Sequence, residues 1–310
     1  MIDRVSPPAV LDYPPVVAFR DIDELEQALR AADYLPDRGL STALFLALTL
    51  EKPLLLEGEA GVGKTEAAKA LARTTNARLI RLQCYEGLDV AHAVYEWNYP
   101  RQLLHLRAAQ EGTVSEDELF GKRFLIRRAL LEAIDSDDPV VLLIDEIDRA
   151  DEEFEAFLLE VLSDFQITIP EIGTIKARRR PAVILTSNRT RELHDALKRR
   201  ALFQWIGHPS IEREIEIVKL RIPGIAERLA AEAAAFVREL RGLDLTKPPG
   251  VAETIDWAMA LNALGRQEID AQVVEQTLCS ILKYREDVET VRDDTLAGLV
   301  ESARSAAAGR

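Results

Sequence analysis

One short segment of the chain has the residue types and the spacing needed to hold phosphate groups. It reads Gly58-Glu59-Ala60-Gly61-Val62-Gly63-Lys64-Thr65, between the apolar run 53–56 and the helix-forming run 66–72. Its glycines allow a tight bend whose backbone N–H groups point at an anion, beside the positive end of the following helix. We expect Lys64 to reach the outer phosphates of a nucleotide and the Thr65 hydroxyl to bind Mg²⁺. The alternative is a glycine-rich turn that binds nothing.

A second segment supplies two adjacent carboxylates. Asp145 and Glu146 follow the apolar run 140–144, which is typical of a buried parallel strand. Open α/β sheets place their chemistry at the carboxyl ends of such strands. We expect Asp145 to hold the water shell of Mg²⁺ opposite Thr65, and Glu146 to orient and polarise an attacking water. The alternative for Glu146 is a surface carboxylate at a strand end.

A third polar group ends the predicted buried strand 182–188, which is apolar up to its last three residues. Asn188 closes that strand, and its side-chain amide could reach the γ-phosphate or the attacking water. Together the three segments predict a site for ATP and Mg²⁺ in which ATP is hydrolysed. The residues expected to bind the nucleotide are Glu59, Ala60, Gly61, Val62, Gly63, Lys64, Thr65, Glu66 and Asp145.

The elements that must position these groups follow from the period of the apolar residues. The sequence predicts strands at 53–56, 78–84, 140–144, 182–188 and 203–206, with helices at 21–29, 40–50, 66–72, 152–164 and 192–201. From residue 211 onward the pattern is helical only. We therefore expect an extended, proline-containing arm at 1–20, an α/β nucleotide-binding domain at 21–208 and an all-helical domain at 209–310.

Two further segments read as β-hairpins outside this pattern. Tyr95, Trp97 and Tyr99 alternate before the turn-prone residues 98–101, which predicts one hairpin, followed by a helix at 120–134. The alternative is that these aromatic side chains pack into the core. A second hairpin is predicted from the runs 166–170 and 173–176.

Composition limits the kind of partner. The formal net charge of −14 argues against a broad nucleic-acid surface, because such surfaces depend on clustered Lys and Arg. No apolar run approaches the ~20 residues that span a bilayer, and the N-terminus lacks a secretory pattern. Cys84 and Cys279 are far apart and are expected to be reduced, buried thiols, as in a cytoplasmic protein.

Taken in order, these segments resemble the motifs of an AAA+ ATPase of the MoxR type. Gly58 to Thr65 is similar to Walker A, Val140 to Glu146 to Walker B, and Thr186 to Asn188 to sensor 1. Leu193 to Arg200 lies where the family carries its arginine finger. The resemblance implies a parallel sheet of order 5-1-4-3-2 with a C-terminal helical lid. It also implies a finger at Arg199 or Arg200; we favour Arg200, with Arg199 bracing the interface. In contrast to many AAA+ proteins, the region 250–257 holds no sensor 2 arginine, and Arg241 lies before the break at 248–249.

The same resemblance implies a working context. Such proteins act as rings, often hexamers, on protein clients, and the sequence looks most like the CoxD-type group linked to maturation of a carbon monoxide dehydrogenase metal centre. A von Willebrand factor A-domain partner is implied as well. The alternatives are a nucleic-acid motor or loader of the same superfamily, a small-molecule kinase, and a switch that binds ATP and barely hydrolyses it.

Overall fold

The computed structural model describes residues 19–108, 116–292 and 296–309, so most of the expected N-terminal arm lies outside the described residues. The described chain separates into two compact units. One is formed by the chain up to Glu57 together with Thr65–Gln204, and the other by Gly58–Lys64 together with Trp205–Arg310. The phosphate-loop segment therefore groups with the helical C-terminal part, although its flanking strand and helix belong to the α/β part.

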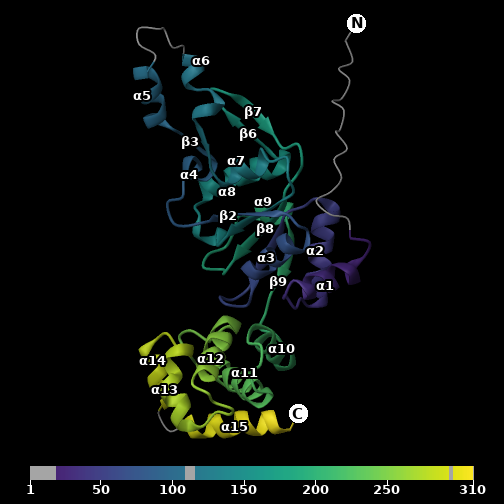
Figure 1. Cartoon of the computed structure of the whole chain (residues 1–310), viewed down its shortest axis with the longest axis vertical. Coiled ribbons are helices and arrows are strands. Elements are labelled where there is room, and N and C mark those ends of the chain that lie inside the picture. The colour runs from purple at the N-terminus through teal and green to yellow at the C-terminus, as the bar shows by residue number, and fades with distance from the viewer. Residues whose placement is uncertain (1–18, 109–115, 293–295, 310) are drawn as a thin grey trace. The chain divides into compact units, whose positions relative to one another are not determined.

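A five-stranded sheet forms the centre of the first unit (Figure 1). Its strand order is β2-β5-β8-β1-β9, which confirms the expected order 5-1-4-3-2 once the hairpin strands are left out of the numbering. The parallel pairings place Asp145 of β5 opposite Gln83 of β2, and Leu56 of β1 opposite Thr186 of β8. The carboxyl ends of β1, β5 and β8 therefore lie together. The strands are β1 (Leu54–Glu57), β2 (Arg78–Gln83), β5 (Val140–Asp145), β8 (Ala182–Ser187) and β9 (Leu202–Trp205).

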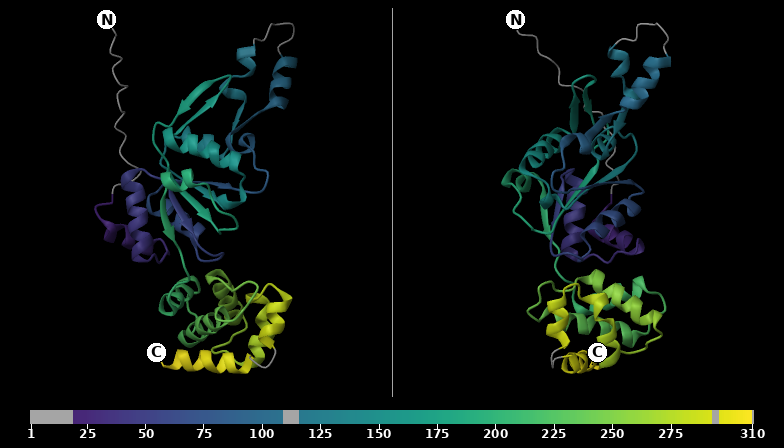
Figure 2. Two further views of the ribbon diagram at one scale, coloured as in Figure 1. Left: turned by 180° about the vertical axis from the view of Figure 1, so that it is seen from behind. Right: turned by 90° about the vertical axis from the view of Figure 1, so that its left-hand side faces the viewer.

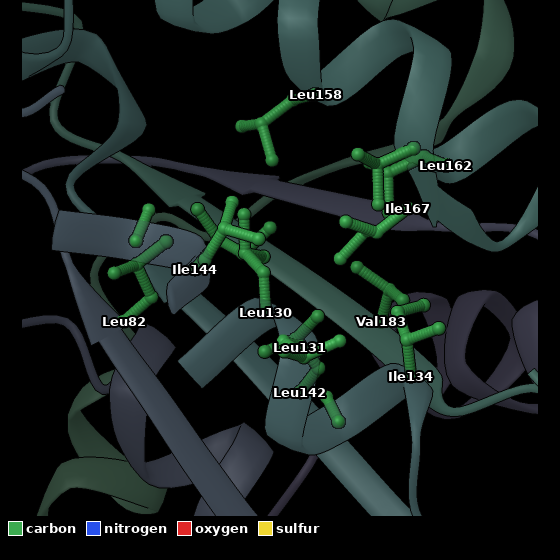
Figure 3. Close-up of a cluster of buried hydrophobic side chains, with 14 of the residues drawn as sticks. Leu82, Leu130, Leu131, Ile134, Leu142, Ile144, Leu158, Leu162, Ile167 and Val183 are labelled. Carbon is green, nitrogen blue, oxygen red and sulfur yellow. The ribbon is translucent and has the colours of Figure 1, made fainter. Parts of the chain in front are cut away.

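Both faces of the interior strand β5 are buried, as its apolar sequence predicts. One face packs against the helices that follow β4 and β5, and Figure 3 shows Leu142 and Ile144 beside Leu130, Leu131 and Leu158. The helices of this unit are α1 (Ile22–Ala31), α2 (Arg38–Leu50), α3 (Lys64–Thr74), α4 (Val90–Val94), α5 (Tyr99–Ala108), α6 (Glu116–Leu119), α7 (Ala129–Ile134), α8 (Glu152–Asp164) and α9 (Asp195–Arg200), with short 3₁₀ turns η1 (Lys122–Phe124) and η2 (Ile147–Arg149).

One of the two expected hairpins is confirmed and the other is wrong. Strands β6 (Gln166–Ile169) and β7 (Gly173–Lys176) pair antiparallel, as predicted. Strand β3 (Tyr95–Trp97) instead pairs with β4 (Leu125–Arg127), and the residues that were expected to form its turn begin α5. Asn98 caps that helix, because its side-chain Oδ1 accepts a hydrogen bond from the backbone N–H of Arg101 at 3.0 Å.

The segment between β3 and β4 also corrects two related expectations. The helix predicted over 120–134 is confirmed only in its second half: η1 and β4 occupy the first half, and α7 covers Ala129–Ile134. Trp97 is 6% exposed and its ring meets that of Phe120 edge-on at 5.2 Å, so the core alternative holds for this residue. Both further views show α5 and α6 projecting away from the central sheet (Figure 2).

The second unit is helical from Ile211 onward. Its core is formed by side chains of α10 to α15, with Phe236 and Trp257 in ring contact at 5.2 Å. Alanines of α11 contribute several of the fully buried positions, so neighbouring helices can approach its axis closely. The helices are α10 (Ile211–Arg221), α11 (Glu227–Arg241), α12 (Val251–Ala263), α13 (Ala271–Ile281), α14 (Arg285–Arg292) and α15 (Leu296–Ala308).

The expectation for the two cysteines is half right. Cys84 is buried, but Cys279 is exposed, because it lies on the face of α13 opposite its buried residues Val274, Leu278 and Ile281. No helix in the described ranges is both long and apolar enough to cross a bilayer.

Candidate functional site

The glycine-rich loop holds its lysine inward. The ammonium of Lys64 is buried and donates hydrogen bonds to the carbonyl oxygens of Gly58 at 2.7 Å and Glu59 at 2.6 Å. Gly61 and Gly63 have φ angles of +78° and +95°, which disfavour any residue with a Cβ. The sequence therefore needs glycine at these positions to fold the backbone around the cation. A buried ammonium enclosed by a loop backbone is a suitable partner for phosphate oxygens.

Within the same unit, the start of α12 touches this loop. The backbone N–H of Ala252 donates to the carbonyl of Gly61 at 3.2 Å, and a Cβ on Gly250 would lie 2.7 Å from the carbonyl oxygen of Ala60. Glu253 caps the helix by accepting from the backbone N–H of Gly250 at 2.9 Å. The segment without a sensor 2 arginine thus contacts the phosphate loop through its backbone.

Thr65 and Asp145 meet at the ends of α3 and β5. The Thr65 hydroxyl lies 3.1 Å from Oδ1 and 3.3 Å from Oδ2 of Asp145, whose carboxylate is buried. The hydroxyl of Thr186, on the neighbouring strand β8, also donates to Oδ1 of Asp145. A hydroxyl and a carboxylate that converge in this way form the oxygen donor set that Mg²⁺ prefers. The residues present therefore fit the metal that the sequence predicts.

Glu146 leaves the strand in a left-handed conformation. Its φ and ψ angles are +55° and +49°, and its backbone N–H donates to Thr186 Oγ1 at 2.9 Å. The side chain is only half-buried and forms an ion pair with Arg149 at 3.3 Å. This turn therefore holds a partly exposed carboxylate directly after the buried Asp145. Such a group can accept a proton from a water molecule.

Asn188 is positioned by a residue that the sequence analysis did not single out. The buried carboxylate of Asp148, in η2, accepts hydrogen bonds from the backbone N–H of Asn188 at 3.2 Å and of Thr190 at 2.9 Å. It also accepts from the Thr190 hydroxyl at 2.7 Å. The turn after β8 is therefore fixed to the turn after β5. The signal available in the sequence was a third carboxylate just after Asp145 and Glu146.

Arg199 and Arg200 end the short helix α9. Leu197 anchors this helix in the core, and both arginine side chains are exposed. Neither arginine forms a hydrogen bond or ion pair with any residue that the structure describes. The helix begins later than expected, at Asp195, because His194 Nδ1 accepts from the N–H of Ala196 and caps it.

Comparison with known proteins agrees with this geometry. The family model described as "ATPase family associated with various cellular activities (AAA)" matches residues 54–207, which contain every residue discussed above except those of α12. The chain carries an AAA domain, of the AAA+ ATPase family. The five-stranded P-loop fold and the paired carboxylates are those expected of an ATPase domain.

The AAA domain is similar to that of several curated proteins. A ClpA homolog protein of Fuscovulum blasticum is 29% identical over 263 residues, covering 82% of this chain and 25% of that protein. Chaperone protein ClpB of Corynebacterium diphtheriae is 27% identical over 300 residues, covering 91% of this chain and 32% of that protein. Proteasome-activating nucleotidase 2 of Halobacterium salinarum is 26% identical over 207 residues, covering 62% of this chain and 42% of that protein. The chain thus spans less than half the length of each of these relatives.

Solved structures resemble the fold more distantly. The RuvB Holliday junction branch migration motor of Thermotoga maritima has a TM-score of 0.46 and 18% identity, covering 83% of this chain and 70% of that one. The likeness concerns the fold alone.

The AAA domain contains a further polar contact that sequence reasoning missed. Arg81 of β2 donates from Nε to Asp145 Oδ2 at 2.9 Å, and its Nη2 lies 2.6 Å from the same oxygen. The two residues are far apart in sequence, and Arg81 belongs to an alternating run that indicates only a strand. The parallel register of β2 with β5 brings them together.

Cys84 lies beside the same carboxylates. Its backbone N–H donates to the carbonyl of Asp145 at 2.8 Å. Burial, and secondarily the negative charge of Asp145, raise the pKa of the Cys84 thiol to about 12. The thiol is therefore neutral at physiological pH, which makes it a poor nucleophile.

Proposed function

We propose that this protein hydrolyses ATP with Mg²⁺ and uses the energy to remodel a protein client, working as a homo-oligomeric ring with six subunits as the expected number. The observation that carries the proposal is the pair Arg199 and Arg200, exposed at the end of α9 and without a partner among the described residues. Exposed arginines are most often simply solvated. The order of the motifs, however, places this pair where AAA+ rings present a finger to the neighbouring subunit.

The residues of the site have distinct roles in this proposal. Lys64 and the loop backbone hold the phosphates, while Thr65 and Asp145 hold Mg²⁺, which would neutralise charge on the phosphate oxygens. Glu146 takes a proton from the attacking water, and the amide of Asn188 orients that water or the γ-phosphate. An arginine from the next subunit stabilises the charge that develops on the phosphate. The helical region 209–310 acts as the lid.

An exposed apolar surface supports a protein client. Tyr99, Leu103, Leu104 and Leu106 of α5 are all exposed, with Leu104 at 66%, on the segment that projects away from the central sheet (Figure 2). Apolar and aromatic side chains of this kind are typical of binding hot spots for protein chains. A small-molecule kinase would have no use for such a surface, and the formal net charge of −14 is unfavourable for a nucleic-acid motor.

The finer assignment rests on the sequence resemblance to the MoxR type and its CoxD-like group. It makes the client a metalloenzyme whose centre is being assembled, with a von Willebrand factor A-domain protein as a partner, in the cytoplasm. The curated relatives that are named as chaperones support client remodelling in general.

Subunit mixing tests the ring and the finger together. Arg200→Ala keeps an intact phosphate site without a finger, and Lys64→Ala keeps the finger without nucleotide binding. Each variant alone should lose hydrolysis, by roughly 10³–10⁵-fold for the finger. A one-to-one mixture should recover measurable turnover. Some interfaces then combine the intact phosphate site of an Arg200→Ala subunit with the intact arginine of a neighbouring Lys64→Ala subunit. Lys198→Ala, in the same helical turn, is the matched control and should keep the wild-type rate.

The outcomes separate the alternatives. Arg199→Ala, tested in the same way, decides between the two arginines, which point about 100° apart on a helix. Wild-type turnover by both arginine variants, or no recovery in either mixture, would overturn the finger assignment. Hydrolysis that requires an added small phosphoryl acceptor would instead favour the kinase.

A further inference from the structure

The carboxylate expected to serve Mg²⁺ already has a cation beside it. Asp145 Oδ2 accepts from Arg81 Nε at 2.9 Å and lies 2.6 Å from Arg81 Nη2, while its Oδ1 accepts from the hydroxyls of Thr65 and Thr186. Both carboxylate oxygens are therefore satisfied by residues of the chain itself. Asp145 is 4% exposed, and an ionised carboxylate at such a depth needs a compensating positive charge.

The cation is held much less firmly than the carboxylate. Arg81 is 49% exposed, and it lies on β2, the edge strand of the sheet. Its other hydrogen bond is to Gln83, two residues along the same strand. The guanidinium can therefore turn out into water by rotating its own side chain, without disturbing the core.

We propose that Arg81 is an exchangeable counter-ion of Asp145, which Mg²⁺ must displace when it arrives with the nucleotide. Two guanidinium nitrogens of Arg81 already contact Oδ2, so the guanidinium competes with the metal and its water shell for that oxygen. Arg81 then sets the Mg²⁺ concentration at which the site takes up nucleotide. The inference rests on Thr65 and Asp145 as the groups that hold Mg²⁺, and it is independent of the client.

The direction in which an Arg81 substitution changes Mg²⁺-dependent nucleotide binding distinguishes competition from other roles of Arg81. If Arg81 competes with Mg²⁺, removing its charge strengthens Mg²⁺-dependent nucleotide binding. If Arg81 instead positions Asp145 or contacts the phosphates, the same change weakens that binding. If a charge-assisted hydrogen bond must be broken before Mg²⁺ binds, the affinity of the site for Mg²⁺ is lower by roughly tenfold.

The experiment measures binding of a fluorescent ADP analogue to the full chain over a range of Mg²⁺ concentrations. For Arg81→Gln, the half-saturating Mg²⁺ concentration should fall about tenfold. Arg81→Lys, which keeps the charge but has a single ammonium group in place of the planar fork, should lie between that variant and wild type. Arg78→Gln is the matched control: Arg78 is on the same strand, pairs with Glu132 rather than Asp145, and should leave the Mg²⁺ dependence unchanged.

An unchanged or increased Mg²⁺ requirement in Arg81→Gln would overturn the inference. If that variant fails to fold cooperatively, Arg81→Lys is the test: a lower half-saturating Mg²⁺ concentration supports the inference, and an unchanged or higher one overturns it. Asp145→Asn tests the assignment of Asp145 to Mg²⁺ separately from the inference about Arg81. Wild-type Mg²⁺ dependence in this variant would show that Asp145 does not serve the metal, and would overturn both that assignment and the inference.

Discussion

Two arginine–carboxylate pairs in this chain each hold a buried carboxylate but differ in the exposure of the arginine. In the α/β unit, Asp145 is 4% exposed and its partner Arg81 is 49% exposed. In the helical unit, Glu214 of α10 is 1% exposed and its partner Arg241 of α11 is only 11% exposed. The Arg241 guanidinium makes two parallel hydrogen bonds of 2.7 Å to Glu214 and a third, also of 2.7 Å, to the carbonyl of Pro249.

The difference separates an exchangeable pair from a fixed one. Arg241 joins α10, α11 and the loop before α12, and Thr254 adds a hydrogen bond of 2.6 Å to Glu214. Removing either partner would leave a buried charge without compensation. Arg81 can leave Asp145 for water, so a metal can take its place. Substitutions in the α/β site should therefore change chemistry, and substitutions at the helical pair should change stability.

The largest expected effect tests the chemical side of this comparison. Glu146→Gln should reduce ATP turnover by roughly 10²–10⁴-fold while ATP still binds, because the amide keeps the shape of the side chain and loses the base. The half-buried position predicts a change in unfolding free energy within about 0.5 kcal/mol. Turnover and nucleotide binding are measured on the same preparation. Full turnover in this variant would remove Glu146 from the mechanism.

The next effect tests the structural side. Arg241→Met should lower the free energy of unfolding by about 3–5 kcal/mol, since Glu214 would be left buried and unpaired. Chemical denaturation followed by circular dichroism measures the change. Arg285→Met provides the matched control, because Arg285 pairs with Glu289 on the surface and should cost less than about 1 kcal/mol. Equal effects at the two positions would mean that burial does not distinguish the pairs.

The smallest effect concerns the two thiols, one in each unit. With a pKa of about 12, Cys84 has a thiolate fraction of about 10⁻⁴ at pH 8, whereas Cys279 is exposed. A thiol reagent such as DTNB should therefore label one cysteine quickly in the folded protein and the second only after denaturation. Cys279→Ser, the control, should abolish the fast phase. Fast labelling of that variant would show that the strand end near Asp145 is open to solvent.

The parts of the site that the sequence predicted are those encoded by neighbouring residues. The phosphate loop and the pair Asp145 and Glu146 are contiguous, so their residue types and flanking apolar runs indicate strand, loop and helix directly. The strand order followed from the family resemblance. Arg81 was missed because its contact with Asp145 depends on which strands are neighbours in the sheet. No local pattern carries that information.

Two of the wrong expectations have equally specific causes. The alternation of Tyr95 and Trp97 correctly indicated a strand, but alternation does not identify the partner strand, which is β4. Asn98 favours a turn and a helix N-cap alike, and here it caps α5. For Cys279, the general tendency of cysteine to be buried was applied without its place on the helix face, and α13 turns that position outward.

The left-handed backbone at Glu146 implies a trade-off between stability and activity. A non-glycine residue at a φ of +55° costs about 1 kcal/mol relative to glycine, which adopts this conformation freely. Selection for a stable fold alone would therefore favour glycine at position 146. The chain keeps glutamate there, directly after the buried Asp145, and so retains strain at a position where the proposed mechanism needs a carboxylate. Stabilising this protein by replacing every such strained residue with glycine would therefore remove its proposed base.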